Sequence, residues 1–424
     1  MLIPLFEWLK ELGVSGTGIM QYVTFRAGMS FILALLIATI IGRRIIDYMR
    51  IHQIGDRPRD IGVDGLESKK GTPSMGGVII FIAIVIPALL FTDLSNVYVW
   101  LMLATTVFLT ALGFIDDYIK VFRKNKDGLS GRWKIVGQVG VGVMLGLTLY
   151  LNSDVVIREN AETPTHTAAS ELVSGSVQYS GTTIKSTQTT IPFVKNNNFD
   201  YKWLASGLPD DWQQTAGWII FIVVTVFIVT GTSNGSNLTD GLDGLTAGIC
   251  AIIGVGMMIL AYVSSHIVYA SYLNIMYIPG SQEVFVYMAA FTGACMGFLW
   301  YNGFPARVFM GDTGSLMLGG LIATVAIILH KEILLILFCG VFLVESLSVI
   351  AQSTYFKYTR RRYGQGRRIF RCTPIHHHFQ KSAGEIQALW QRPATKLHEQ
   401  TIVLRFWLIT VILCALAIIT LKIR

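Results

Sequence analysis

The sequence has few charged residues: only 14% of its 424 residues are Asp, Glu, Lys or Arg, whereas 52% are apolar. Because a soluble globular domain has about 25% charged residues, the composition argues against a water-soluble enzyme of several domains. Disorder is excluded as well, since disordered chains are poor in apolar residues. The composition is that of a multispanning membrane protein, and at about 20 residues per span ten spans would use close to half of the chain.

Cysteine is also scarce. The five cysteines stand singly, without a CxxC pair, and four lie in apolar runs, which argues against a disulfide framework or a zinc ribbon. A cleavable signal peptide is not indicated, because Glu7, Lys10 and Glu11 precede the first long apolar run. We therefore expect the first span to remain in the membrane.

The apolar runs predict an all-α polytopic membrane protein with about ten transmembrane helices in one domain, residues 1–424. The glycines between positions 137 and 146 fit either a nucleotide-binding turn or close helix packing. Packing is favoured, because no strand–turn–helix pattern surrounds them. The ten segments are 22–42, 75–92, 97–115, 133–151, 214–231, 244–263, 284–300, 314–330, 332–352 and 402–421.

Basic residues assign the two sides of the membrane, because Lys and Arg collect in cytoplasmic loops. Of the 34 Lys and Arg residues, 24 lie in alternate loops, namely 43–74, 116–134, 232–243, 301–313 and 353–400. We predict that these loops are cytoplasmic and that both termini are external. The net charge of +8 follows from this topology and does not call for a nucleic-acid partner.

The external segment 152–213 is an insertion rich in Ser, Thr and Asn. Short alternating runs on either side of Ser180-Gly181 indicate a small β-hairpin. Because it contains no catalytic constellation, we interpret it as a surface elaboration, with a docking role as the alternative.

Unusual polar residues gather on the predicted cytoplasmic side, beginning with Asp116 and Asp117 at the end of the third span. Adjacent carboxylates repel each other unless one is protonated or a cation lies between them. Mg²⁺ is often held by one or two carboxylates together with substrate phosphate. A solvated acidic pair at a helix end is the alternative interpretation.

Two further loops carry acids and amides. Asn237, Asp240 and Asp243 lie in a glycine-rich loop between the fifth and sixth spans, and the two Asp share one helical face if the sixth span begins there. Asn302 and Asp312 lie in the loop before the eighth span. Helix N-capping also explains such residues, so each motif alone is ambiguous. An EF-hand is excluded, because the required glutamate is missing.

The loop 353–400 holds His376, His377 and His378 directly after a proline. Three consecutive His cannot share one helix face, so we predict an extended turn that presents them to a cleft. Zinc is one interpretation, but phosphate contact or proton transfer fits better, because His titrates near neutral pH. The arginines between positions 360 and 371 are interpreted mainly as surface charge near anionic lipid headgroups.

Lys69 precedes a glycine-rich turn at the start of the second span, which suggests a diphosphate clamp without a Walker pattern. Carboxylates that hold Mg²⁺, together with Lys, Asn and His donors, are the inventory of phosphoryl transfer. Their position at one membrane face indicates one soluble cytoplasmic substrate and one lipid substrate.

Taken together, the motifs GTPSMGG, GFIDDYIK, NLTDGLDG, FMGDTGSL and PIHHHF resemble the phospho-N-acetylmuramoyl-pentapeptide transferase (MraY) family of polyprenyl-phosphate transferases. The resemblance implies ten transmembrane helices and a cytoplasmic active site in the bacterial inner membrane. It implies that UDP-N-acetylmuramoyl-pentapeptide and undecaprenyl phosphate give lipid I and UMP, with Mg²⁺ as cofactor, in the first membrane step of peptidoglycan synthesis. A homodimer is also suggested.

The resemblance assigns roles residue by residue. Asp116, Asp117 and Asp312 match the three essential aspartates of the family, with Asp312 as the main Mg²⁺ ligand, Asp117 as a supporting ligand, and Asp116 as the group that deprotonates or positions the lipid phosphate. Ten further residues match substrate-binding positions: Lys69, Ser74, Asn237, Asp240, Asp243, Asn302, Gln352, His376, His377 and His378.

The chain departs from the family pattern at Gln380, where many members have an acidic residue, and in the longer segments 152–213 and 379–400. Direct attack and a phospho-enzyme route both remain compatible with the residues. A sibling transferase that uses UDP-N-acetylglucosamine is one alternative, which PIHHHF disfavours. A transporter is the other, although transporters place their polar sites near the bilayer midplane.

Overall fold

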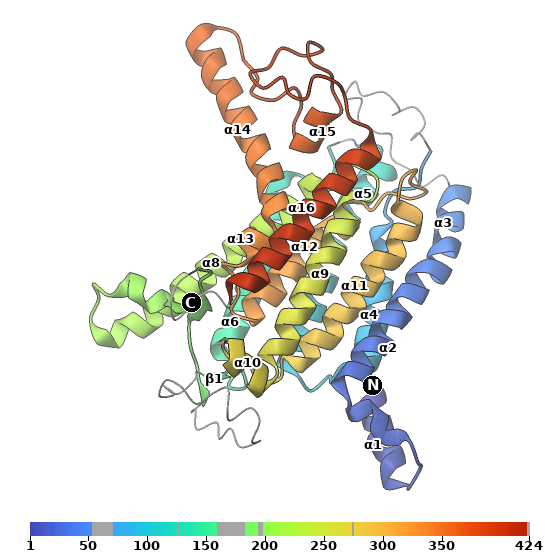
Figure 1. Cartoon of the computed structure of the whole chain (residues 1–424), viewed down its shortest axis with the longest axis vertical. Coiled ribbons are helices and arrows are strands. Elements are labelled where there is room, and N and C mark those ends of the chain that lie inside the picture. The colour runs from blue at the N-terminus through green and yellow to red at the C-terminus, as the bar shows by residue number, and fades with distance from the viewer. Residues whose placement is uncertain (53–70, 126, 159–182, 194–197, 274, 422–424) are drawn as a thin grey trace.

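The computed structural model is a bundle of helices, shown in Figure 1. It describes residues 1–52, 71–125, 127–158, 183–193, 198–273 and 275–421. The long elements are α2 (Val23–Leu36) continued by η2 (Ile37–Ile41) and α3 (Gly42–Ile51), α4 (Gly77–Phe91), α5 (Val97–Val121), α6 (Gly131–Leu151), α8 (Asp210–Thr239), α9 (Leu245–Ser264), α11 (Gln282–Asn302), α12 (Gly311–Ile328), α14 (Gly340–Tyr363) and α16 (Glu399–Thr420). The short elements are α1 (Leu2–Glu11), η1 (Thr17–Gln21), η3 (Tyr201–Ala205), α10 (Ile267–Leu273), α13 (Leu335–Phe338) and α15 (Ile375–Phe379).

Ten helical crossings can be followed through the described residues. Eight of them are long and apolar enough to span a membrane. The other two are α4, which has only 15 residues, and α14, whose last turn carries three arginines. The predicted all-α polytopic membrane fold is therefore confirmed.

Successive crossings alternate in direction, which sorts the connections into two groups (Figure 1). The α5–α6, α8–α9 and α11–α12 junctions lie at the end of the bundle that carries α15, which we call the α15 end. The α4–α5, α9–α11 and α12–α14 junctions lie at the opposite end, which carries α10 and which we call the α10 end. All loops predicted to be cytoplasmic and described by the structure are thus at the α15 end.

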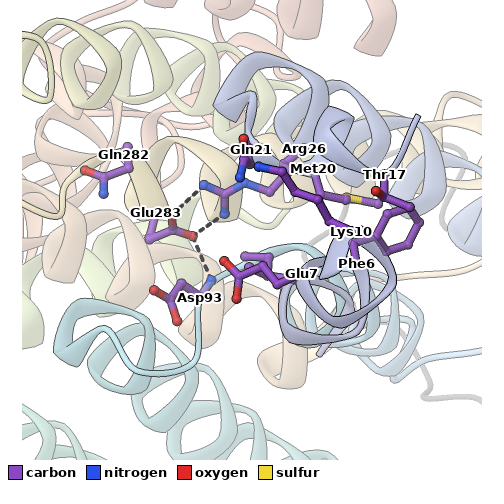
Figure 2. Close-up of a pocket in the computed structure, with 11 residues that line it drawn as sticks. Phe6, Glu7, Lys10, Thr17, Met20, Gln21, Arg26, Asp93, Gln282 and Glu283 are labelled. Carbon is purple, nitrogen blue, oxygen red and sulfur yellow. Dashed lines mark hydrogen bonds and ion pairs between the residues drawn. The ribbon is translucent and has the colours of Figure 1, made fainter. Parts of the chain in front are cut away.

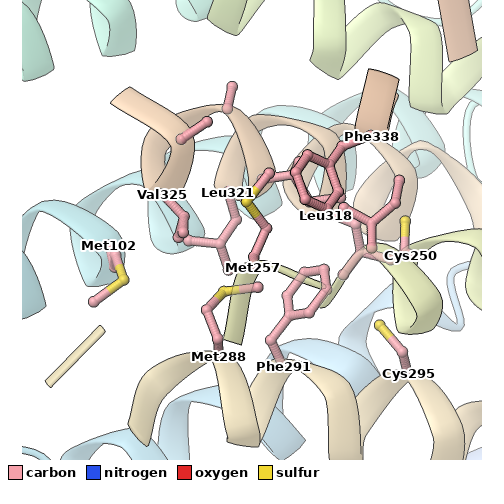
Figure 3. Close-up of a cluster of buried hydrophobic side chains, with 14 of the residues drawn as sticks. Met102, Cys250, Met257, Met288, Phe291, Cys295, Leu318, Leu321, Val325 and Phe338 are labelled. Carbon is pink, nitrogen blue, oxygen red and sulfur yellow. The ribbon is translucent and has the colours of Figure 1, made fainter. Parts of the chain in front are cut away.

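The core of the bundle is built around α12, in which 16 of 18 residues are buried. A helix that is apolar on all sides is expected inside a bundle, and α12 packs against α4, α5, α8 and α9. Figure 3 shows Leu318, Leu321 and Val325 of this core together with Met257 of α9 and Met288 of α11. The first turn of α12 carries Asp312, so the most buried helix also positions an acid at the α15 end.

Glycines bring α4 and α5 into backbone contact with the start of α12. A Cβ atom at Gly77 would lie 2.1 Å from the backbone nitrogen of Gly314, and one at Gly113 would lie 2.2 Å from the carbonyl oxygen of Asp312. The Gly77 amide also donates to the Met310 carbonyl at 2.8 Å. These contacts fix the position of the Asp312 turn against two neighbouring helices.

Two of the predicted packing glycines of α6, Gly142 and Gly146, lie against α8. A Cβ atom at Gly142 would lie 2.7 Å from the Cα atom of Val226, and one at Gly146 would lie 3.0 Å from the Ile222 side chain. Both partners belong to α8. Small residues at a helix interface allow this close approach within a membrane.

The insertion 152–213 forms two small antiparallel sheets at the α10 end. Strand β1 (Ile157–Arg158) pairs with β2 (Thr183–Ile184), and β3 (Gln188–Thr190) pairs with β4 (Asn198–Asp200). The predicted hairpin turn at Ser180-Gly181 lies outside the described residues. The strand that follows this turn is β2. It pairs with β1, which lies more than 20 residues earlier in the sequence.

Strand β3 is tied to the bundle by a buried polar tripeptide, residues 330–332, in the α12–α13 connection. The Lys331 ammonium donates to the Thr190 hydroxyl at 2.8 Å, and His330 Nδ1 lies 2.8 Å from the Gln188 carbonyl oxygen. Lys331 is fully buried. Because buried charged groups need polar partners, the insertion is part of the packing of this end of the molecule.

Two predicted segment boundaries are wrong. The expected crossing 332–352 is broken at Cys339 into α13 and α14, and α14 continues to Tyr363, beyond the rest of the bundle (Figure 1). Helix α8 continues to Thr239, so residues 233–239 form its last two turns and not a loop. The apolar runs did not predict these helix extensions, because the last turns of α8 and α14 consist mainly of polar residues.

We expect Gly77→Ala to destabilise the protein, because the added methyl group overlaps backbone that cannot move independently. Overpacking of this kind costs about 1–3 kcal/mol. The measurement is the thermal unfolding midpoint of the detergent-solubilised protein. Gly140→Ala is the matched control, since no atom lies within 4 Å of its added Cβ; a midpoint that falls equally in both variants would contradict the role of the contact.

Candidate active site

Three aspartates converge at the α15 end of the bundle. Asp116 and Asp117 lie in α5, one turn before its end, and Asp312 lies in the first turn of α12. One carboxylate oxygen of each lies within 4.8 Å of the others. The structure therefore brings together residues that are far apart in the sequence, as the family resemblance implied.

Asp117 caps the start of α12. Its carboxylate accepts from the Asp312 amide at 3.1 Å, from the Thr313 amide at 2.9 Å and from the Thr313 hydroxyl at 2.6 Å. A carboxylate is stabilised at a helix N-terminus by unpaired amides and by the helix dipole. Asp117 is thus held rigidly between α5 and α12.

Asp116 is neutralised by two lysines. It is fully buried, and its carboxylate forms ion pairs with Lys120, one turn later on α5, and with Lys134 of α6 at 2.9 Å. The Leu129 amide donates to the same carboxylate at 2.7 Å. Burial of an ionised carboxylate requires such partners.

Asp312 shares both lysines and adds an amide. Its Oδ2 atom lies 2.6 Å from Lys134 Nζ and 3.2 Å from Lys120 Nζ, while its Oδ1 atom accepts from Asn237 at 3.0 Å. Asn237 also donates to the Ser315 hydroxyl at 2.9 Å. The last turn of α8 therefore reaches the acidic cluster through Asn237.

Asp240 lies beside the cluster, in the tight turn that joins α8 to α9. Burial, followed by the nearby negative charges of Asp312 and Asp117, raises the pKa of Asp240 to about 8. The turn ends at Gly244, whose φ of 77° favours glycine, and α9 begins only at Leu245. The expectation that Asp240 and Asp243 share a helical face is therefore wrong.

Asp243 and Asn302 each bind backbone groups of the neighbouring loop. Asp243 accepts from the Ala306 amide at 2.9 Å, and Asn302 accepts from the Gly244 amide at 3.1 Å while donating to the Val308 carbonyl at 2.9 Å. The structure places them next to the turn of Asp240, where they shape the backbone around the site.

The three His form a short helix, α15, and not the predicted extended turn. Its start follows Pro374, and the helix aims each ring in a different direction. His376 is fully buried, with Nδ1 3.1 Å from the Glu345 carboxylate of α14. Its Nε2 atom packs against Gly241, where a Cβ would lie only 2.2 Å away.

His377 and His378 have different surroundings. His377 is partly exposed, and its Nδ1 lies 2.8 Å from the Gln380 side-chain oxygen. His378 is buried; its Nδ1 accepts from the Arg371 amide at 3.1 Å and its Nε2 lies 2.7 Å from the Arg392 carbonyl oxygen. Burial is the largest cause that lowers the pKa of His378.

Arg371 and Gln352 organise the same segment. Arg371 is fully buried, so the prediction of surface charge is wrong for this arginine; its guanidinium donates to the Lys381 carbonyl. The Gln352 side-chain oxygen accepts from the amides of Ile369 and Phe370 at 2.8 Å and 3.0 Å. Gln352 thus fastens this loop to α14.

Ser74 is buried in the segment that leads into α4. This segment lies against residues 309–310, since the Phe309 amide donates to the Pro73 carbonyl and the Gly76 amide donates to the Phe309 carbonyl, each at 2.8 Å. Ser74 is thereby placed close to the turn of Asp312. Lys69 lies outside the described residues.

The acidic cluster fits a hard divalent cation. All candidate ligands are carboxylate oxygens, the type that Mg²⁺ prefers, and the Asp312 side chain is 14% exposed whereas that of Asp116 is fully buried. Asp312 is therefore the most accessible ligand. In the structure its carboxylate pairs with Lys120 and Lys134, so a cation would share it with these ammonium groups.

Sequence reasoning missed four partners of the predicted site residues. Lys120 stands four residues after Asp116, a helical spacing that favours an ion pair, so its role could have been found. Lys134, Thr313 and Glu345 carry no such signal, because each meets its partner only through packing between helices.

Two family models match the chain. Residues 99–330 match the model described as Glycosyl transferase family 4, and residues 69–81 match phospho-N-acetylmuramoyl-pentapeptide-transferase signature 1. Together with a membrane bundle that holds a polar site at one end, the match defines a membrane-embedded transferase of this glycosyl transferase class.

Curated relatives are similar over the whole chain. The sequence is 57% identical over 426 residues to the phospho-N-acetylmuramoyl-pentapeptide-transferase of Parabacteroides distasonis, 55% over 431 residues to that of Porphyromonas gingivalis and 54% over 429 residues to that of Bacteroides thetaiotaomicron, with 100% of both chains covered each time. The chain belongs to the phospho-N-acetylmuramoyl-pentapeptide-transferase family. The predicted family and enzyme class are confirmed.

We expect the unfolding midpoint of the metal-free protein to fall as the pH rises from 6 to 9. In the Asp240→Asn variant the midpoint should fall less over the same range. The raised pKa of Asp240 means that the folded state keeps a proton that the unfolded state releases near pH 4, so stability is fully present below about pH 4, falls as the pH rises and levels off above about pH 8. The measurement is the unfolding midpoint in EDTA across this range. Asp127→Asn, at an exposed position of the same end, should follow the wild type, and identical profiles for all three proteins would contradict the assignment.

Proposed function

We propose that this chain transfers phospho-N-acetylmuramoyl-pentapeptide from its UDP derivative to undecaprenyl phosphate, at the cytoplasmic face of the bacterial inner membrane. The products are lipid I and UMP. The observation that carries the proposal is the cluster of Asp116, Asp117 and Asp312, held with Lys120 and Lys134 at one end of a membrane bundle. The full-length relatives of the same name support the substrate pair.

In the proposed reaction, an oxygen of the lipid phosphate forms a bond to the sugar-linked phosphorus. The bond from that phosphorus to the bridging oxygen breaks, and its electron pair leaves with UMP. Asp116 positions or deprotonates the attacking phosphate. Lys120 and Lys134 favour the ionised forms of Asp116 and Asp312 and fix the positions of their carboxylates. They also place positive charge near the incoming phosphate oxygens.

We propose Asp312 and Asp117 as the residues that hold Mg²⁺. The ion supplies charge neutralisation at the diphosphate when it is bound. Asn237 orients Asp312. The other assigned residues surround the nucleotide-sugar in this proposal; they are Lys69, Ser74, Asp240, Asp243, Asn302, Gln352, His376, His377 and His378. A homodimer, suggested by the family resemblance, is part of the proposal.

The substrate assignment is tested by UMP release. Purified protein with Mg²⁺ and undecaprenyl phosphate should release UMP from UDP-N-acetylmuramoyl-pentapeptide and form a lipid-linked product. With UDP-N-acetylglucosamine, the release should be lower by about 100-fold or more, as expected when a site built for polar substrate groups loses them. Equal release from both sugars would favour the sibling transferase, and no release from the first would remove the proposal.

Asp312→Ala should lower UMP release by about 100-fold or more, the loss typical of a removed electrostatic contact to a developing charge. The folded bundle should be retained, which a monodisperse gel-filtration peak would check. The control is Asp127→Ala, which removes an exposed carboxylate from the same end of the bundle and should leave UMP release unchanged. Retained activity in Asp312→Ala would take Asp312 out of the mechanism.

A further inference from the structure

A polar cavity, shown in Figure 2, lies beside α1 at the α10 end of the bundle, opposite the end that carries the three aspartates (Figure 1). It has a volume of about 260 Å³ and lies between α1 and η1 on one side and the starts of α2 and α11 on the other. We call it the N-terminal pocket. Helix α1 is fastened above it, because the Met1 ammonium donates to the Leu89 carbonyl of α4 at 2.8 Å.

The floor of the N-terminal pocket is a buried ion pair. Arg26 donates from both terminal nitrogens to the two carboxylate oxygens of Glu283, each at 2.7 Å, and Glu283 also accepts from the Asp93 amide at 2.8 Å. Arg26 is only 6% exposed, and its Nε atom has no hydrogen-bond partner among the described residues. Arg26 and Glu283 thus form a charge-balanced floor, and the charges within reach of a ligand are those of the walls.

The walls of the pocket carry opposite charges on opposite sides. Glu7 and Lys10 both project from α1, and neither forms an ion pair within the described part of the chain. Figure 2 shows the Glu7 carboxylate on the side of Asp93, whereas the Lys10 side chain extends toward Gln21 and Arg26. Such a lining matches a ligand that carries an anionic and a cationic group a short distance apart.

The position of α1 indicates that the ligand comes from the membrane. Leu5 and Trp8 of this helix and Leu12 directly after it are 47%, 55% and 60% exposed, although all three are apolar or aromatic. A short helix with exposed apolar residues and Trp, next to the ends of membrane spans, is typical of a helix in the membrane–water interface. Phe6 turns from the same helix into the pocket and offers an apolar contact.

We propose that the N-terminal pocket binds the headgroup of a zwitterionic phospholipid that carries a primary ammonium group. The phosphate accepts from Lys10, the ammonium donates to Glu7 and Asp93, and the glycerol end rests on Phe6. An anionic headgroup without an ammonium brings no cation to the two carboxylates. A quaternary ammonium lacks the N–H donors that those carboxylates require.

The test is lipid retention by the full chain in detergent, measured by native mass spectrometry. Phosphatidylethanolamine, phosphatidylglycerol and phosphatidylcholine with matched acyl chains are added separately. We expect the wild type to retain phosphatidylethanolamine about fivefold better than either other lipid. Lys10→Gln and Glu7→Gln should each remove most of this preference, because each deletes one charge of the complementary pair.

Glu11→Gln is the matched control, because Glu11 lies on the same helix and is exposed but does not line the pocket. It should keep the wild-type preference. Equal retention of the three lipids by the wild type, or the same loss in Glu11→Gln as in Glu7→Gln, would overturn the proposal. Free phosphoethanolamine should compete with the lipid, whereas competition by inorganic phosphate at equal strength would show a plain anion site and would also overturn it.

Discussion

The architecture depends on keeping three carboxylates close together at the end of a membrane bundle. Each ionised carboxylate removed from water is costly unless it finds partners, and like charges add to the cost. Each carboxylate has a different set of partners. Asp117 binds the start of α12, Asp116 pairs with two lysines, and Asp312 pairs with Asn237 and the same lysines. Four helices must meet for this to happen.

This requirement explains why α12 is so deeply buried. Helices α4 and α5 touch its first turn through glycines, α6 supplies Lys134 and α8 supplies Asn237. The same contacts hold positive and negative groups in fixed positions before any substrate arrives. Such preorganisation is what electrostatic catalysis of phosphoryl transfer needs, so the packing of the core and the proposed chemistry have one physical origin.

Much of the fold could be predicted, because membrane spans are recognisable in the sequence as long apolar runs. The boundaries at α8 and α14 could not, since polar residues continue these helices past the apolar stretch. In the site, Asp116 and Lys120 are linked by helical spacing, whereas Lys134 and Glu345 meet their partners only in three dimensions. The conformation of the His motif was also beyond the sequence, because a proline followed by three His is compatible with a turn or with a helix start.

The contact between Gly241 and His376 has a consequence for how this sequence can vary. The imidazole ring fills the space in which any other residue at position 241 would place its Cβ, and a carboxylate on α14 holds the ring from the other side. A larger residue at 241 can be accommodated only if the residue at 376 shrinks or the ring moves away from Glu345. The glycine-rich turn and the histidine motif, distant in the chain, are therefore sterically linked, and a change at one position narrows the set of residues that fit at the other.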